Sequence, residues 1–342
     1  MARAKISDVA KHAGLSVSTV NRVLNEPTKV REETFNAVLQ AAEAIGFYGL
    51  GTIRSQINAR RPKYRFGFLL LQPTRTYYRM LGVAIASAAQ NFDGVEIEVV
   101  VAYAEDLSPQ HVAAKLLELG ASCQAVAVVA AVHPLVMEAV DTLQAKGVPV
   151  FGLLSQLSAT GNVNYVGLDN WKAGRTAAWA IANLCKQPGK VGILVGNHRF
   201  RCQEMNESGF RSYFREFAPD FTLLEPLATF ETSAVAEELT EKMLAEHPDL
   251  SGLFMAGGGI SGVMAALRTC DRAGKVVTVG HQLMDYTRLG LLDGTLSMIL
   301  ESPTEKFVHE TFSAMIRACQ SGEDQGRQTV VIPFEIFTRE NI

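Results

Sequence analysis

The sequence has few cysteines, and none of them stand in a pair at metal-binding or redox spacing. Five scattered cysteines argue against a zinc site and against a disulfide framework, and they are typical of a reducing cytosol; they are Cys123, Cys185, Cys202, Cys270 and Cys319. No apolar run approaches the roughly 18 residues of a membrane-spanning helix. The N-terminal segment MARAKISDVA also lacks the apolar stretch of a secretory signal. We therefore expect a cytoplasmic protein with no bound metal and no membrane partner.

The short motifs of several enzyme classes are missing too. The esterase motif G-x-S-x-G, the zinc-protease motif H-E-x-x-H and the phosphate-loop motif G-x-x-x-x-G-K-[ST] do not occur. His198 and His281 could serve as acid–base groups, although a histidine in a binding pocket more often donates a hydrogen bond. Nothing marks Cys202, which lies near His198 in the sequence, as an activated nucleophile. These absences favour a binding protein that is not an enzyme and has no cofactor.

The chain of 342 residues is long enough for more than one domain, and 48% hydrophobic with 20% charged residues is ordinary for a globular protein. Its net charge of −3 conceals an asymmetry. Residues 1–65 hold eleven Lys and Arg against five Asp and Glu, so this segment carries an excess of six positive charges and the remainder an excess of nine negative ones. A basic N-terminal module on an acidic body is typical of a nucleic-acid-binding head.

Residues 5–25 show the pattern of two short helices joined by a tight turn. Apolar residues recur three or four positions apart on both sides of Gly14; they are Ile6, Val9, Ala10, Ala13, Val20, Val23 and Leu24. Gly14 can end the first helix in a left-handed conformation, and Ser16 can cap the second. The pattern predicts a helix-turn-helix unit, whose second helix enters the major groove of DNA. An ordinary amphipathic hairpin packed on a larger domain is the alternative.

The polar residues of the second helix suit DNA. Arg22 has a planar fork that can bond guanine O6 and N7 together. Short polar side chains suit phosphate oxygens, and these are Ser16, Thr19, Asn21 and Asn25. A third helix over residues 31–47 completes a headpiece, residues 1–48, that would be only marginally stable alone.

The stretch ISDVAKHAGLSVSTVNRVLN resembles the headpiece of the LacI-type (lactose/purine repressor) family, whose pattern is D-V-A-x-x-A-G-V-S-x-x-T-V-S-R-V-L-N. The match is dense and lies at the extreme N-terminus, where that family carries it. The resemblance implies that Val17, Ser18 and Arg22 read bases. Asn21 stands where the family usually has Ser.

Residues 49–65 form a basic linker. The resemblance implies a short hinge helix here, which pairs with its twin and wedges a leucine into the minor groove. Arg54 matches the usual A-R-x-L, Gln56 takes the leucine position, and Ile57 is the nearest apolar residue. Either Ile57 is the wedge in a shifted register, or the DNA is kinked less, or the segment is a solvated tether that touches only phosphates.

From residue 66 onward, buried strands alternate with amphipathic helices, which is typical of parallel sheets covered on both faces. The strands predicted lie at 65–72, 95–103, 125–131, 148–154, 163–168, 190–196, 222–229, 253–257, 276–281 and 295–301. So many strands favour an α/β core of two doubly wound lobes, residues 66–163 with 295–324 and residues 164–294 with 325–342. This core resembles the periplasmic-binding-protein-like core of the same family, so the resemblance covers nearly the whole chain.

Ligands of such folds lie beyond the carboxyl ends of the strands, here between the lobes. The candidates for effector binding are Gln72, Thr74, Tyr77, Ser155, Asp169, Asn170, Arg199, Arg201, Asn206, Gly258, His281 and Gln282. Each one alone is more often a loop or capping residue; Asp169, for instance, suits the N-cap of the helix that it opens.

The family pattern is kept at some of these positions and altered at others. VGLDNWKAG matches the segment V-x-x-D-N-x-x-A-G, which supports Asp169 and Asn170. Asn206 replaces the arginine of R-x-x-G-F, and Gln282 replaces the aspartate of V-G-F-D. With these anchors altered, we expect an effector other than a common neutral hexose. An anionic or polyol-acid ligand would suit the basic side chains among the candidates, which are His281, Arg199 and Arg201.

Residues 257–262, GGGISG, satisfy G-x-G-x-x-G after a predicted strand and before a helix, which is the context of a dinucleotide-binding loop. Alone, the motif would indicate a nucleotide-dependent oxidoreductase. The next strand, however, ends in His281 and Gln282 without the expected acidic residue, and the motif comes late in the chain. The glycines would instead let a helix N-terminus approach a ligand closely.

These observations predict a sequence-specific transcription regulator, a homodimeric repressor whose operator affinity is controlled by a sugar, polyol or sugar-acid effector. One short recognition helix reads few base pairs, so a pseudo-palindromic operator requires two. Closure of the lobes on a ligand would shift the linker and change the spacing of the paired headpieces. Two alternatives stay open: a solute-binding protein without a DNA role, and the oxidoreductase.

Overall fold

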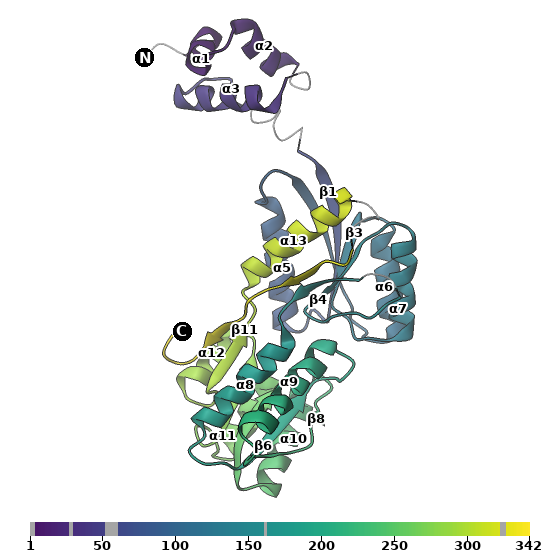
Figure 1. Cartoon of the computed structure of the whole chain (residues 1–342), viewed down its shortest axis with the longest axis vertical. Helices are drawn as coiled ribbons and strands as arrows, with labels where there is room; N and C mark the ends of the chain where they lie inside the picture. Colours follow the sequence, from purple (N-terminus) through teal and green to yellow (C-terminus); the bar gives the residue numbers. More distant parts are fainter. Residues whose placement is uncertain (1–3, 27–29, 52–60, 161–162, 322–325) are drawn as a thin grey trace. The chain divides into compact units, whose positions relative to one another are not determined.

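The computed structural model describes residues 4–26, 30–51, 61–160, 163–321 and 326–342 (Figure 1). The chain divides into two compact units, one formed by residues 1–64 with 90–98 and the other by residues 65–89 with 99–342. No helix in these described ranges is long and apolar enough to cross a membrane.

The described part of the N-terminal unit includes the helices α1 (Ile6–Ala13), α2 (Val17–Asn25) and α3 (Glu32–Ala44). Gly14 ends α1 at φ 67°, a left-handed conformation that costs glycine little. Ser16 caps α2, because its Oγ accepts a hydrogen bond from the Thr19 backbone N–H at 3.1 Å. The small core joins all three helices and includes Val9, Val20, Val23, Phe35 and Val38. The two predicted helices and the turn between them are confirmed.

Six strands of the described chain form the first sheet, in the order β12-β5-β4-β3-β1-β2. They are β1 (Lys63–Leu70), β2 (Glu96–Tyr103), β3 (Ala125–Val128), β4 (Val150–Leu153), β5 (Asn164–Gly167) and β12 (Thr329–Val331). The pairings from β12 through β1 are parallel. Parallel strands buried on both faces explain the continuous apolar runs of the sequence.

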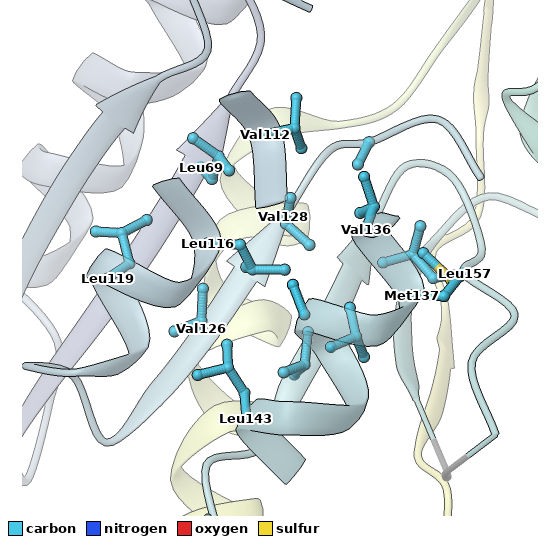
Figure 2. Packing of buried hydrophobic residues seen from close by; sticks show 14 of the residues in the cluster. Leu69, Val112, Leu116, Leu119, Val126, Val128, Val136, Met137, Leu143 and Leu157 are labelled. Atoms are coloured by element: carbon cyan, nitrogen blue, oxygen red, sulfur yellow. The ribbon is translucent and has the colours of Figure 1, made fainter. Parts of the chain in front are cut away.

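Helices cover both faces of the first sheet; they are α5 (Thr76–Gln90), α6 (Pro109–Gly120), α7 (Pro134–Ala145) and α13 (Thr304–Ser321). Figure 2 shows Leu116 of α6 and Leu143 of α7 packed toward Val126 of β3. Alternate residues of β1 point to the other face, where the rings of Phe66 and Phe68 lie 6.3 and 5.7 Å from that of Phe312 on α13.

Seven strands of the described chain form the second sheet, in the order β13-β11-β10-β9-β6-β7 with β8 beside β6. They are β6 (Lys190–Val195), β7 (Thr222–Leu223), β8 (Leu227–Ala228), β9 (Leu250–Met255), β10 (Val277–His281), β11 (Met298–Glu301) and β13 (Glu335–Phe337). Only the pairing of β13 with β11 is antiparallel within these ranges. The helices of this sheet are α8 (Asn170–Leu184), α9 (Arg201–Phe217), α10 (Ser233–Glu246), α11 (Ile260–Thr269) and α12 (Asp285–Leu292).

The fold class is confirmed, but the sheets do not follow the expected lobe boundaries. β5 belongs to the first sheet, β11 to the second, and β12 returns to the first. The chain passes from one sheet to the other only after a strand has ended. The strand before each crossing therefore belongs to the sheet that the chain is leaving, and the boundaries expected at residues 163 and 294 fall one strand too early. The predicted series of elements also stops at residue 301, whereas α13, β12 and β13 follow it.

Helices α8 and α9 pack with their backbones in direct proximity, and two glycines make this possible. A Cβ atom at Gly174 of α8 would overlap the backbone carbonyl of Asn206 on α9, and one at Gly209 of α9 would overlap that of Trp171 on α8. This reciprocal contact fixes the N-terminal halves of both helices, which carry Asn170 and Asn206.

Candidate ligand cavity and nucleic-acid interface

A cavity of about 590 Å³ lies at the carboxyl ends of strands from both sheets. The loop after β1 contributes Thr74 and Arg75, and the first turn of α5 contributes Tyr77 and Tyr78. The loop after β4 contributes Ser155, and α8 and α9 contribute Asn170 and Asn206. The second sheet adds the loops that follow β8, β9, β10 and β11. This is the position at which parallel α/β sheets bind ligands, and the volume suits a small molecule.

Eight of the twelve predicted effector residues line this cavity; they are Thr74, Tyr77, Ser155, Asn170, Asn206, Gly258, His281 and Gln282. Several are fixed by contacts of their own. The Oγ of Ser155 accepts from the Cys202 backbone N–H at 3.3 Å, and the amide of Asn170 donates to the Tyr165 hydroxyl at 3.1 Å. Burial raises the pKa of the Cys202 thiol to about 12, so this group is not an activated thiolate.

The other four predicted residues do not line this cavity, each for a local reason. The Gln72 amide donates to the carbonyl of Glu105, and Asp169 caps α8 by accepting from the Lys172 N–H at 3.1 Å. Arg199 lies in the exposed turn before α9. Arg201, in the first turn of α9, lines a separate cavity of about 220 Å³, which Asp169 also lines.

A buried polar network that the sequence did not reveal crosses the cavity wall. The guanidinium of Arg75, after β1, lies 2.8 Å from the carboxylate of Glu231, after β8, and their side chains are 21% and 8% exposed. Gln203 of α9 donates to the same carboxylate and accepts from the backbone N–H groups of Gly196 and Asn197 at 2.7 and 2.9 Å. The Arg75–Glu231 pair therefore joins a loop of the first sheet to a loop of the second.

The glycine motif makes room for this network. A Cβ atom at Gly258 or Gly196 would overlap the carboxylate of Glu231, and one at Gly257 would lie 2.6 Å from the Gln203 Oε1. The Glu231 side chain thus occupies the space beside Gly258 that a dinucleotide pyrophosphate would need. The G-x-G-x-x-G spacing is thus explained by close packing against protein side chains.

His281 is not the cation that an acidic ligand would need. Burial lowers its pKa to about 4, because charging the imidazole would require solvent that the site excludes. Its Nε2 lies 3.4 Å from the Asn206 amide nitrogen. Together with the positions of Arg199 and Arg201, this means that the basic side chains expected around an anionic ligand do not meet in the main cavity.

Glu301, at the end of β11, is a half-buried carboxyl that sequence reasoning missed. Its pKa is raised to about 7, mainly by burial and to a smaller extent by nearby Glu335, although the backbone N–H groups of Leu283 and Ser302 oppose the shift by donating to the carboxylate. The carboxylate also acts on Tyr77, whose pKa is raised by burial first and by Glu301 second. Glu301 follows a predicted strand, so the strand-end rule could have found it.

Glu301 and His281 are expected to act on stability with opposite signs as the pH changes. A carboxyl with a raised pKa binds an extra proton on folding, so its contribution is present near pH 4.5 and is lost as the pH rises through about 7. The lowered pKa of His281 contributes stability that is present above 6.5 and lost as the pH falls through about 4.

Replacing Glu301 by glutamine should therefore raise the free energy of unfolding above neutral pH by about 2 kcal/mol, with the gain vanishing in mild acid. Urea unfolding followed by tryptophan fluorescence at a series of pH values measures this difference. A gain that is independent of pH would contradict the raised pKa.

The candidate DNA-contact residues of α2 share an exposed surface. Val17, Ser18, Arg22 and Asn25 are exposed, with Val17 46% accessible, whereas Thr19 and Asn21 are partly buried. Ser16 is exposed as well, but its hydroxyl already serves as the cap of α2. An exposed apolar side chain such as Val17 can contact a thymine methyl group, and an exposed arginine such as Arg22 can pair with guanine.

The predicted hinge contacts Arg54, Gln56 and Ile57 fall outside the described residues, so the choice among the three interpretations of the linker stays a prediction.

Comparison with known proteins agrees with both parts of the chain. Residues 66–324 match the family described as periplasmic binding protein domain, and residues 5–49 match bacterial regulatory proteins of the lacI family. The sucrose operon repressor of Streptococcus mutans is 24% identical over 289 residues, which cover 82% of this chain and 80% of that protein. The ribose operon repressor of Bacillus subtilis is 26% identical over 308 residues, 86% of each protein.

A solved structure shares the core fold. A periplasmic solute-binding protein of an ABC transporter from Actinobacillus succinogenes, with bound D-allose, superposes with a TM-score of 0.71 at 20% identity. The match covers 82% of this chain and 98% of that protein. With its core matched over most of its length and its headpiece matched as well, the chain belongs to the periplasmic binding protein domain family and is a transcription regulator of the LacI type.

Proposed function

We propose that this regulator is a dimeric repressor that acts in the cytoplasm and whose operator affinity changes when a small carbohydrate binds the 590 Å³ cavity. The observation that carries the proposal is the presence, on one chain, of a helix-turn-helix headpiece and of a cavity formed by strand ends from two sheets. The named relatives are repressors of sucrose and ribose operons, which supports a sugar as the effector. We assign no catalytic step to the chain.

The proposed mechanism is linkage between the two sites. A ligand that contacts residues from both sheets stabilises one arrangement of the sheets over another. The free energy of this stabilisation equals the difference between its binding free energies for the two arrangements. The Arg75–Glu231 pair already joins the two sheets across the cavity wall, so a ligand acts on a contact that exists. The headpieces of a dimer would then change their spacing and hence their fit to two half-sites one helical turn apart.

Among the DNA contacts, we propose that Val17, Ser18 and Arg22 read bases and that Ser16, Thr19, Asn21 and Asn25 hold phosphates. Exposure of Val17, Ser18 and Arg22 on α2 supports the first group. Arg54, Gln56 and Ile57 remain candidates for contacts near the minor groove.

Arg22→Ala is expected to weaken specific DNA binding by about 1–3 kcal/mol and to relax one base position, because a bidentate pair to guanine is lost. Selection of binding sites from random duplexes with the full-length protein, followed by titration of the selected site, measures both effects. Arg22→Lys is the matched control, since it keeps the charge but loses the fork: it should keep non-specific affinity and still lose the base preference. An unchanged site preference in both variants would contradict the assignment.

A further inference from the structure

Two polar oxygen atoms of the cavity wall have no hydrogen-bond partner in the described part of the chain. Within the described chain, Asn206 Oδ1 and Ser302 Oγ are buried at the cavity and have no hydrogen-bond partner; their residues are 3% and 9% exposed. A buried polar group without a partner is costly, so such atoms usually await water or a ligand. The amide nitrogen of Asn206 already faces the uncharged His281, which leaves its oxygen to receive a donor.

The charged residues of the cavity wall also favour a ligand that donates hydrogen bonds. Arg75 is the one Lys or Arg among the described residues that line the cavity, and its guanidinium is paired with Glu231 at 2.8 Å. Glu301 lines the same cavity and forms no ion pair within the described chain; backbone N–H groups hold its carboxylate. When Glu301 is ionised, above its pKa of about 7, the cavity therefore has one carboxylate more than it has cations.

The Glu301 carboxylate and the Asn206 amide belong to elements that are linked through the β10–β11 ladder. His281, beside Asn206, is the register partner of Leu300 in the β10–β11 ladder, and Leu300 directly precedes Glu301. Tyr77 is close enough to Glu301 to feel its charge, and it packs edge-on against Tyr78 with ring centroids 5.2 Å apart. Aromatic faces beside a carboxylate are a surface that attracts cations as well as apolar sugar faces.

We propose that the effector is an amino sugar, a polyhydroxyl ring bearing a primary ammonium group that lies against Glu301 and donates to Asn206 Oδ1. The inference rests on the proposed carbohydrate-responsive function and narrows its ligand class. The hydroxyl groups supply the further donors that Ser302 and the wall accept. An anionic sugar acid would place a second carboxylate beside Glu301, which costs free energy at short range.

The test is isothermal calorimetry at neutral pH on the full-length protein. The ligands are D-glucosamine, D-galactosamine and D-mannosamine, each with its neutral parent hexose and its N-acetylated form, together with D-gluconate and D-glucuronate. We expect at least one amino sugar to bind about tenfold or more tightly than its parent and its N-acetyl form, the size of a charge-assisted hydrogen bond.

Glu301→Gln should reduce this preference by about tenfold, because glutamine still accepts from Leu283 but carries no charge. Glu335→Gln is the matched control: Glu335 is the register partner of Glu301 in β13, is exposed and does not line the cavity. Because Glu335 raises the pKa of Glu301, this substitution favours the charged form of Glu301, so the preference should stay the same or rise and should not fall.

A neutral hexose that binds as tightly as its amino form, or an equal loss in Glu335→Gln, overturns the amine assignment and leaves the carbohydrate-responsive regulator standing. Binding by the acids alone overturns it as well. Binding by none of the sugars overturns both the amine assignment and the carbohydrate part of the proposed function. The Arg22 experiment reads the DNA part separately.

Discussion

Arg75→Met is expected to destabilise the second unit by about 3–5 kcal/mol, because it leaves the carboxylate of Glu231 buried without its cation. The Glu231 side chain is only 8% exposed, and Gln203 is the one further side chain that donates to it within the described chain. Removing one partner of such a pair costs more than the pair itself contributes, since the remaining charge cannot recover its water. The backbone at Gly196 and Gly258 packs closely against the same carboxylate, so the Glu231 side chain has little room to rotate toward solvent.

Urea unfolding followed by tryptophan fluorescence measures the effect on this unit alone, because both tryptophans of the chain, Trp171 and Trp179, lie on α8. The double variant Arg75→Met with Glu231→Gln is the control: it removes both charges and should recover most of the loss. A loss below about 1 kcal/mol in Arg75→Met would mean that the pair behaves as an exposed one.

Gly174→Ala is expected to destabilise the same unit by about 3 kcal/mol, although alanine is intrinsically the better helix former by about 1 kcal/mol. The added Cβ atom would overlap the backbone carbonyl of Asn206. A flexible side chain could rotate out of the way, but a backbone carbonyl cannot, so the whole of α9 would have to move. Interiors packed at crystal density resist such a shift. The shift would also displace Asn206, so weaker effector binding should accompany the lost stability.

Gly326→Ala serves as the comparison for Gly174, since a Cβ atom there meets no atom within 4 Å and the backbone needs no left-handed φ. It should change the free energy of unfolding by less than about 0.5 kcal/mol. The helix–helix contact described above would be contradicted if both variants were equally stable, or if Gly174→Ala gained the stability that its propensity alone predicts.

Most of the fold could be predicted from the sequence, because the core strands are buried on both faces and stand out as apolar runs. Gly14 and Ser16 predicted the turn and the cap of the headpiece because local backbone chemistry decides both. The edge strands β12 and β13 escaped prediction: each has three residues and is largely exposed, so it lacks an apolar run. Their places in the two sheets come from pairing with distant strands.

The sequence predicted the cavity-lining residues whose position depends only on following a strand. It did not predict those whose position depends on a hydrogen-bond or ion-pair partner. Ser155, Asn170 and His281 follow this rule, whereas Asp169 turns away to cap its own helix. Glu231 follows a segment predicted as one strand that is in fact two strands of two residues each, and it adopts φ 62°, which favours glycine and is not expected for glutamate. Its pairing with Arg75, 156 positions away, depends on the finished fold.

The pairing of β12 with β5 determines the order in which a nascent chain can mature. Residues 329–331 must reach residues 165–167 to complete the first sheet, so this sheet stays unfinished until residue 331 has left the ribosome. The three helices of the headpiece are complete by residue 44. Translation that stops before residue 329 would therefore release a product with an intact recognition helix and an incomplete ligand-binding sheet. Such a product would retain the DNA-contacting surface without the means to respond to a signal.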